Sequence, residues 1–176
     1  MRRFWTVSFV LPLFLGACQV VSPPCLDPWG CLEIPPDGKL LIGLLPSLYG
    51  RFSATGSQIL QAVLNAVSED EFILGRDIEV DWIGVDCDDG SLDLAAQRLV
   101  LIPNLLAVIG PPCPVIDRSV SLLFDQAGIP QISPLQGGEV AYRRIVAALQ
   151  AVAILRSDKT LVVPRSAFWQ ALQRQP

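Results

Sequence analysis

Two kinds of apolar pattern alternate along the chain between residues 39 and 134. Short, nearly continuous apolar runs occupy residues 40–45, 105–110 and 129–132, and an alternating run occupies residues 77–85. Between these runs, apolar residues recur every three or four positions, as they do along one face of a helix. Continuous short runs are typical of strands in a parallel sheet, which are buried on both faces. The pattern predicts an α/β fold with a doubly wound parallel sheet in the strand order 2-1-3-4.

Two loops after the predicted strands are the places where we expect function. In a doubly wound sheet, ligands bind beyond the carboxyl ends of the strands. Here those ends lead into residues 113–115 after the third strand and into residues 133–138 after the fourth.

The first residues have the pattern of an export signal. Arg2 and Arg3 precede an apolar stretch at residues 4–15, and the motif Leu15-Gly16-Ala17-Cys18 follows. This pattern resembles a bacterial lipoprotein signal, in which residues 1–17 are removed and Cys18 is lipidated. The resemblance implies an extracytoplasmic protein with a lipid anchor in the bacterial cell membrane. An ordinary secretory signal with an unrelated cysteine is the alternative, whereas a membrane-spanning helix would need about 20 apolar residues.

Residues 18–38 show little periodicity and are rich in proline, which occurs at Pro23, Pro24, Pro28, Pro35 and Pro36. We expect a tether that holds the folded domain away from the membrane. Cys25 and Cys31 lie within this tether and can close a small loop. The main domain is expected at residues 39–140, and a helix/strand/helix segment at residues 141–176.

Charge and residue types argue against several classes of function. The chain has a formal net charge of -4 and no histidine. Loss of Arg2 and Arg3 with the signal would change this charge to -6, so we expect no nucleic acid as a partner. Without histidine, a histidine-based catalytic triad and histidine metal ligands are impossible.

Two further groups of residues have alternative interpretations. Asp86, Asp88 and Asp89 suggest a metal or phosphoacceptor pocket, but acidic residues at the start of a helix are common for capping alone. Ser133 precedes Pro134 and lacks the glycines that flank a nucleophile elbow. We therefore predict a protein that is not an enzyme and that needs no metal or cofactor.

Several motifs resemble the branched-chain amino-acid-binding proteins, which are type I periplasmic solute-binding proteins of ABC importers. The similarity covers roughly residues 39–140, and the motifs occur in the order typical of that family. They are Leu41–Pro46, the run from Gly50 to Gly56, Asp86-Cys87, Ala107-Val108-Ile109-Gly110-Pro111-Pro112-Cys113 and Ala127-Gly128-Ile129-Pro130-Gln131-Ile132-Ser133-Pro134.

The resemblance implies the amino-terminal lobe of a two-lobed receptor that closes on a small amphipathic solute, such as an amino acid, and delivers it to an ABC permease. It also implies a disulfide between Cys87 and Cys113. The residues that we expect to line the cleft are Tyr49, Cys113, Val115, Ser133, Leu135 and Gln136.

The chain departs from the family at two ligand positions. Where the family has a hydroxyl residue after the cysteine that matches Cys113, this chain has Pro114, which offers neither a hydroxyl nor an N–H. Where the family commonly has a threonine, this chain has Gly137. We therefore expect branched-chain amino acids to bind weakly or not at all.

The family members are about twice as long because a second lobe follows the first. Residues 141–176 instead resemble a late segment of the family, which suggests an internal deletion that removed the second lobe. A protein built from the start with one lobe is the alternative. Two functions remain open: a solute-binding protein for transport, truncated and degenerate in its ligand site, or a lipoprotein interaction module that keeps the lobe as a docking surface.

Overall fold

The computed structural model describes residues 25–70, 72–114 and 118–175. The expected signal peptide, the lipidation residue Cys18, the first part of the tether and the candidate ligand residue Val115 lie outside these ranges.

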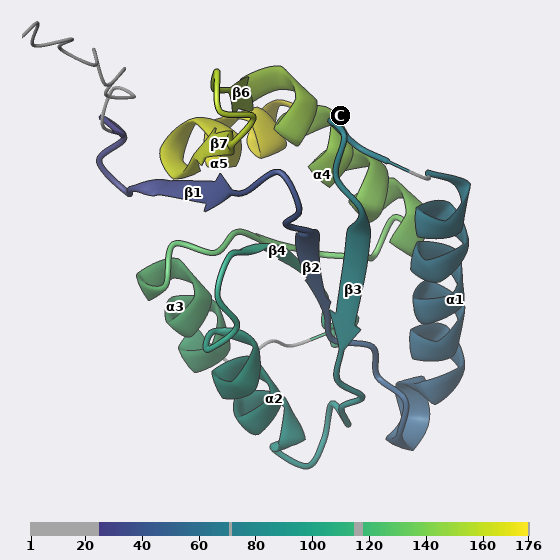
Figure 1. Cartoon of the computed structure of the whole chain (residues 1–176). Coiled ribbons are helices and arrows are strands. Elements are labelled where there is room, and N and C mark those ends of the chain that lie inside the picture. Colours follow the sequence, from purple (N-terminus) through teal and green to yellow (C-terminus); the bar gives the residue numbers. More distant parts are fainter. Residues whose placement is uncertain (1–24, 71, 115–117, 176) are drawn as a thin grey trace, which may run out of the picture.

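A four-stranded parallel sheet forms the centre of the fold (Figure 1). Its strands are β2 (Leu40–Leu44), β3 (Ile78–Trp82), β4 (Leu105–Ile109) and β5 (Gln131–Ile132), and they lie in the order β3-β2-β4-β5. This is the predicted order 2-1-3-4. The fold class inferred from the apolar runs is therefore confirmed.

Helices cover both faces of this sheet. α1 (Ser53–Glu69) packs against α4 (Gly138–Val152) on one face, and α2 (Ser91–Leu99) packs against α3 (Arg118–Gln126) on the other. A short 3-10 helix, η1 (Gly50–Phe52), leads into α1.

The alternation of side chains along β2 divides the core into two parts. Leu40, Ile42 and Leu44 are buried on the side of α1 and α4, whereas Leu45 is buried on the side of α2 and α3. The whole of β4 is buried, as expected for a central parallel strand. These contacts explain why the central strands β2 and β4 have no polar side chains, whereas the edge strand β3 carries Glu79 and Asp81.

A second, antiparallel sheet lies near the amino-terminal ends of the parallel strands (Figure 1). Its order is β1-β7-β6, with β1 at Cys31–Ile34, β6 at Ile154–Leu155 and β7 at Leu161–Pro164. α5 (Arg165–Arg174) follows β7, and its Phe168 packs in the same core cluster as Leu32 and Ile34.

Strand β1 corrects the expected extent of the tether. Residues 31–34 lie within the stretch that we assigned to a spacer, yet they pair with β7 and bury Leu32 and Ile34. The prolines on either side of this strand masked a short alternation of buried and outward-facing residues. The folded part of the chain therefore begins earlier than residue 39.

None of the helices within the described residues is long and apolar enough to span a membrane.

Candidate functional site

The loops after β2, β3 and β4 meet at the carboxyl edge of the parallel sheet. Ser47 forms a parallel bridge with Val85, and the Leu48 N–H donates to the Val85 carbonyl oxygen at 3.0 Å. Leu45 continues the contact of β2 with β4, because its N–H donates to the Ile109 oxygen at 2.9 Å. Backbone hydrogen bonds thus hold these loops together beyond the last residues of the strands.

A disulfide joins Cys87 to Cys113 across this edge, with the two Cα atoms 5.5 Å apart. β2 lies between β3 and β4, so the loops after the outer two strands must lean over the end of β2 to meet. Ser47 follows β2, and its Oγ lies 3.6 Å from Cys87 Sγ. The disulfide implied by the family resemblance is present in the structure.

Ser47 is fully buried beneath the first turn of α1. A Cβ atom on Gly56 would lie 1.8 Å from the Ser47 carbonyl oxygen, so only glycine allows α1 to approach this closely. The Ser47 hydroxyl donates to the Tyr49 backbone carbonyl oxygen at 3.3 Å and orients the loop that carries Tyr49. Sequence reasoning missed Ser47, although an isolated glycine within a helix is a signal of close packing.

The three aspartates at this edge stabilise the loop and the helix start. Asp86 Oδ1 accepts a hydrogen bond from the Asp88 N–H at 3.1 Å, and Asp89 Oδ1 accepts one from the Ser91 N–H at 2.8 Å. The hydrogen bonds from Ser91 lower the pKa of Asp89. Within the described ranges, no group of three or more acidic or cysteine side chains has the arrangement of a metal site.

The candidate ligand residues that the structure describes follow strands at this same edge. Tyr49 comes after β2, Cys113 after β4, and Ser133, Leu135 and Gln136 after β5. Tyr49 and Leu135 are 63% and 75% exposed, whereas Cys113 is buried in its disulfide. The edge is an open surface rather than an enclosed cavity at these side chains. Their role in binding stays a prediction.

Both departures from the family pattern also lie at this edge. Pro114 is exposed directly after the disulfide. Gly137 has a φ of 116°, which side chains with a Cβ rarely adopt, and its N–H donates to the Pro134 oxygen at 2.9 Å. A threonine would be strained in this backbone conformation, so the local fold itself excludes the hydroxyl that the family has there.

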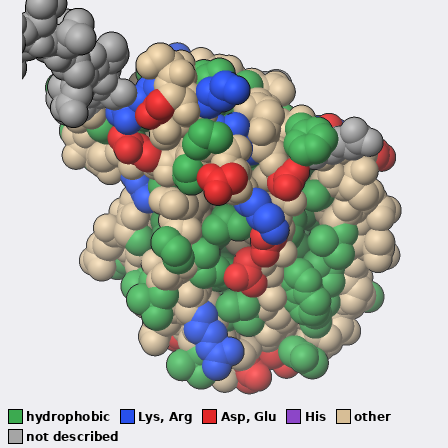
Figure 2. Space-filling model, in the orientation of Figure 1, with side chains coloured by type: hydrophobic (Ala, Val, Ile, Leu, Met, Phe, Trp, Pro, Cys, Tyr) green, Lys and Arg blue, Asp and Glu red, His purple; other side chains and the backbone are tan. Residues whose placement is uncertain are grey.

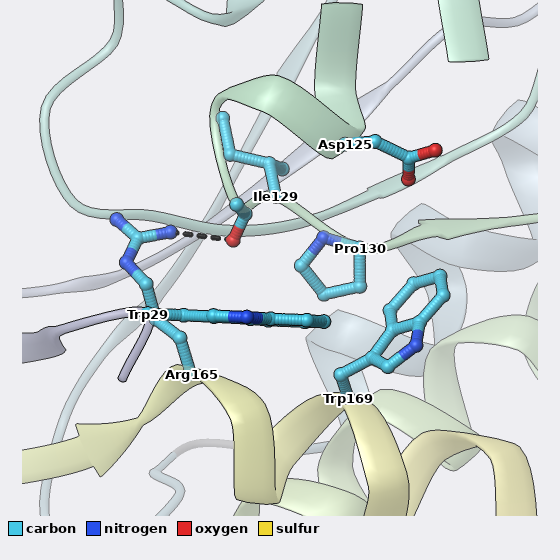
Figure 3. Close-up of a pocket in the computed structure, with 7 residues that line it drawn as sticks. Trp29, Asp125, Ile129, Pro130, Arg165 and Trp169 are labelled. Carbon is cyan, nitrogen blue, oxygen red and sulfur yellow. Dashed lines mark hydrogen bonds between the residues drawn. The ribbon is translucent and has the colours of Figure 1, made fainter. Parts of the chain in front are cut away.

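A pocket of about 310 Å³ lies at the opposite, amino-terminal edge of the sheet, where two indole rings line it (Figure 3). Trp29 comes from the loop before β1, Trp169 from α5, and Pro130 from the residue directly before β5. Arg165 Nη1 donates to the Gly128 oxygen at 2.7 Å. Burial lowers the pKa of Arg165, and the negative charge of Asp27, which raises this pKa, offsets only part of the effect. No sequence pattern predicted this pocket, because its walls come from three distant segments: the loop before β1, residues 125–130 and α5.

Comparison with solved structures identifies the fold. Over 55% of this chain, the structure matches LivJ of Streptococcus pneumoniae, a branched-chain amino acid transporter substrate binding protein in complex with isoleucine, with a TM-score of 0.51 and 25% sequence identity. The chain has the fold of a type I periplasmic-binding-protein lobe. A putative branched-chain amino acid ABC transporter from Rhodospirillum rubrum matches this type I lobe over 55% of the chain, with a TM-score of 0.51 and 21% identity.

The type I lobe corresponds to a minor part of those two proteins, since the matched regions span 28% and 29% of their lengths. No protein-family model matches the sequence, and no curated protein does. The matches to solved structures nevertheless confirm the resemblance to branched-chain amino-acid-binding proteins.

Proposed function

We propose that this protein is a lipid-anchored, extracytoplasmic solute-binding lobe that serves an ABC permease for amino acids of the branched-chain type. The observation that carries the proposal is the type I lobe itself, with its Cys87–Cys113 disulfide closing the carboxyl edge where ligands of such sheets bind. The solute-binding role follows from the fold, while the anchor follows from the motif that ends at Cys18.

The affinity for a free branched-chain amino acid is expected to be low. Pro114 and Gly137 remove two donors for the ligand carboxylate, and each charge-assisted hydrogen bond contributes about 1.5–3 kcal/mol. At about 1.4 kcal/mol per tenfold change, this loss weakens binding by roughly two to four orders of magnitude. Exposure of Tyr49 and Leu135 adds to this effect, because contacts in water are weaker than contacts in an enclosed site.

A thermal-shift screen tests the solute-binding role. The chain from Cys18 onward contains every residue that the structure describes, and it is titrated with millimolar isoleucine, leucine and valine. A ligand that binds only the folded state raises its unfolding temperature. We expect a small shift, and a larger one for Pro114→Ser, which restores a hydroxyl and an N–H after the disulfide. An exposed change on another face, Gln97→Ser in α2, is the control and leaves the response unchanged.

Isothermal titration gives the decisive affinities. A sub-micromolar dissociation constant for the unaltered chain would contradict our view of Pro114 and Gly137. Absence of any response in both the unaltered chain and Pro114→Ser would contradict the solute-binding role.

The second candidate function is a docking module without a solute, which the exposure of Tyr49 and Leu135 favours. A photo-crosslinking residue at Tyr49, on the full chain in its native membrane, separates the two. A permease as the captured protein supports transport. A different envelope protein, captured equally with and without added amino acids, supports the docking module.

A further inference from the structure

Exposed apolar side chains surround the loop that the Cys25–Cys31 disulfide closes. Leu26 is 89% exposed and Trp29 is 54% exposed, and both belong to this loop. Ile154 of β6 is 56% exposed, and the half-buried Trp169 of α5 lines the same pocket as Trp29. We call these four residues the amino-edge patch.

The pairing of the small sheet explains why the patch faces outward. Directly opposed residues in an antiparallel sheet point to the same face. Leu32 and its partner Val163 are buried in the core, so the next pair, Cys31 and Pro164, lies on the outer face. Ile154 and Val162 are paired on that outer face as well. Glu33 is the other partner of Val162 and also lies on this outer face, where its carboxylate pairs with Arg156 at 3.0 Å.

The outer face and the disulfide loop form a second pocket, of about 510 Å³, lined by Cys25, Leu26, Asp27, Pro28, Cys31, Ile154, Arg156, Val162 and Pro164. The loop therefore separates two apolar hollows, one with Leu26 and Ile154 and one with the two tryptophans. A contiguous exposed apolar region of this kind marks a surface of interaction.

The patch is held in a fixed position. Asp27 accepts hydrogen bonds from the Trp29 N–H at 2.8 Å and from Ser166 Oγ at 2.6 Å. The Arg165 N–H donates to the Gly30 oxygen at 3.1 Å. These bonds fasten both ends of the loop to α5, so the apolar side chains do not depend on a partner for their placement.

The length of chain before the patch indicates what covers it. Cys25 lies seven positions after Cys18 in the sequence, and seven residues at full extension span at most about 25 Å. A lipid on Cys18 would therefore keep Cys25, where the disulfide loop of the amino-edge patch begins, within that distance of the bilayer. Tryptophan is the residue most typical of the membrane–water interface, where its apolar ring and polar N–H are both satisfied.

The distribution of charge favours the same orientation. Three acidic residues, Asp86, Asp88 and Asp89, lie at the carboxyl edge, where, among the described residues, only Asp88 is in an ion pair, with Arg51 at 2.8 Å. Figure 2 shows acidic and basic side chains in both the upper and the lower part of the molecule. Near the patch, Glu33 pairs with Arg156 at 3.0 Å. An anionic membrane surface would thus repel the carboxyl edge more strongly than the amino edge.

We infer that the amino-edge patch rests on the headgroup region of the membrane and holds the carboxyl-edge loops away from it. This inference rests on the lipid anchor of the proposed function. It assigns a role to the apolar outer face of the small sheet, which the solute site does not use.

Quenching of tryptophan emission by brominated lipid tests the inference. The chain from Cys18 onward has one cysteine outside the two disulfides, Cys18, which is coupled to a maleimide phospholipid in vesicles of phosphatidylcholine and phosphatidylglycerol. One variant retains only Trp29 (Trp82→Phe, Trp169→Phe), and the other retains only Trp82 at the end of β3 (Trp29→Phe, Trp169→Phe). We expect dibrominated phosphatidylcholine to lower Trp29 emission about twofold and to leave Trp82 emission unchanged, because quenching requires contact with the interface.

The outcomes separate the patch from the anchor. Vesicle flotation confirms attachment, and equal quenching of the two tryptophans, or none at Trp29, would overturn the inference. Leu26→Ser with Ile154→Ser should reduce the quenching of Trp29, whereas Leu94→Ser with Leu122→Ser, at exposed positions on α2 and α3, should not. Since Cys18 is coupled chemically, selective Trp29 quenching supports the patch even if cells never lipidate the chain, a result that would contradict only the proposed anchor.

Discussion

Asp27 Oδ2 accepts a hydrogen bond of 2.6 Å from Ser166 Oγ, across 139 positions of sequence. The Ser166 N–H also donates to the two carboxylate oxygens, at 3.2 and 3.1 Å. Ser166 lies in the first turn of α5, where backbone N–H groups have no partner within the helix. The N-cap residue of α5, Pro164, supplies no side-chain hydrogen bond. A carboxylate from the amino-terminal loop therefore caps the carboxyl-terminal helix.

The first prediction concerns this cap. Asp27→Ala should lower the free energy of unfolding by about 1 kcal/mol, the usual cost of losing a helix cap. Urea denaturation at pH 7 measures the difference. Asp37→Ala, at an exposed carboxylate beyond β1, is the control and should have little effect.

The stability that the Asp27–Ser166 contact contributes should depend on pH. Burial raises the pKa of Asp27, but the hydrogen bonds from Ser166 and Trp29 outweigh it, and the pKa lies below the ordinary value of 3.8. Because the folded-state pKa is the lower one, the stabilisation is present above about pH 3.8 and is lost as the pH falls through the folded-state pKa. Asp27→Asn should therefore lose less stability than the unaltered chain between pH 5 and pH 3. An identical acid dependence in both would refute the contact as the cause.

The second prediction concerns Tyr142, which is buried between α4 and α1. Its hydroxyl donates to Asp70 Oδ2 at 2.9 Å, and Arg143 Nη1 donates to the same oxygen at 2.8 Å. Tyr142→Phe should cost about 1.5 kcal/mol, since a hydrogen bond to a charged group is lost while Arg143 still pairs with Asp70. Chemical denaturation of Tyr142→Phe beside Tyr49→Phe, at an exposed tyrosine, measures this cost.

An alkaline titration extends this prediction. Burial, followed by the hydrogen bond and charge of Asp70, raises the pKa of Tyr142 well above its ordinary value of 10.0. The raised folded-state pKa means that the stabilisation is complete below about pH 10 and is lost as the pH rises above it. Stability should thus fall less steeply above pH 10 in Tyr142→Phe than in Tyr49→Phe. If the free energy of unfolding of the two variants changes equally with pH above 10, the contact between Tyr142 and Asp70 is not its cause.

The third prediction ranks the two disulfides. Cys87 and Cys113 are 26 positions apart, and Cys25 and Cys31 are 6 apart. In the chain-entropy model, the longer loop contributes about 3.5 kcal/mol and the shorter one about 2.4 kcal/mol. Replacing each pair by alanine should therefore destabilise the chain more at Cys87 and Cys113. Peptide mapping without reductant should recover both linked pairs, and free thiols at Cys87 and Cys113 would be incompatible with the structure.

The fourth prediction concerns the anchor. The full chain, expressed in a bacterium, should be cleaved before Cys18 and should partition with membranes and into the detergent phase. Cys18→Ser should abolish both cleavage by the lipoprotein peptidase and lipid incorporation. Ser22→Ala, a nearby change outside the Leu15-Gly16-Ala17-Cys18 motif, is the control. Normal processing and membrane partition of Cys18→Ser would rule out lipidation at this residue.

Much of the fold could be predicted because local patterns dictate it. The apolar runs at residues 40–45 and 105–110 become the two central strands, since such runs are stable only when both faces of a strand are covered. The helices between them follow from periodicity, and the strand order follows from the short connections. The resemblance to solute-binding lobes could be recognised from the motifs in the loops that follow these strands.

Contacts between distant segments decided the rest. β1 has four residues between prolines, and it becomes a strand only because β7 supplies the partner groups. The cap of α5 by Asp27 and the shared pocket of Trp29 and Trp169 likewise join opposite ends of the described chain. Such contacts leave no periodic signal, since each depends on where the whole chain brings its ends. The sequence by itself therefore determined the parallel sheet and its loops, while tertiary packing decided the amino-edge sheet and the surface it presents.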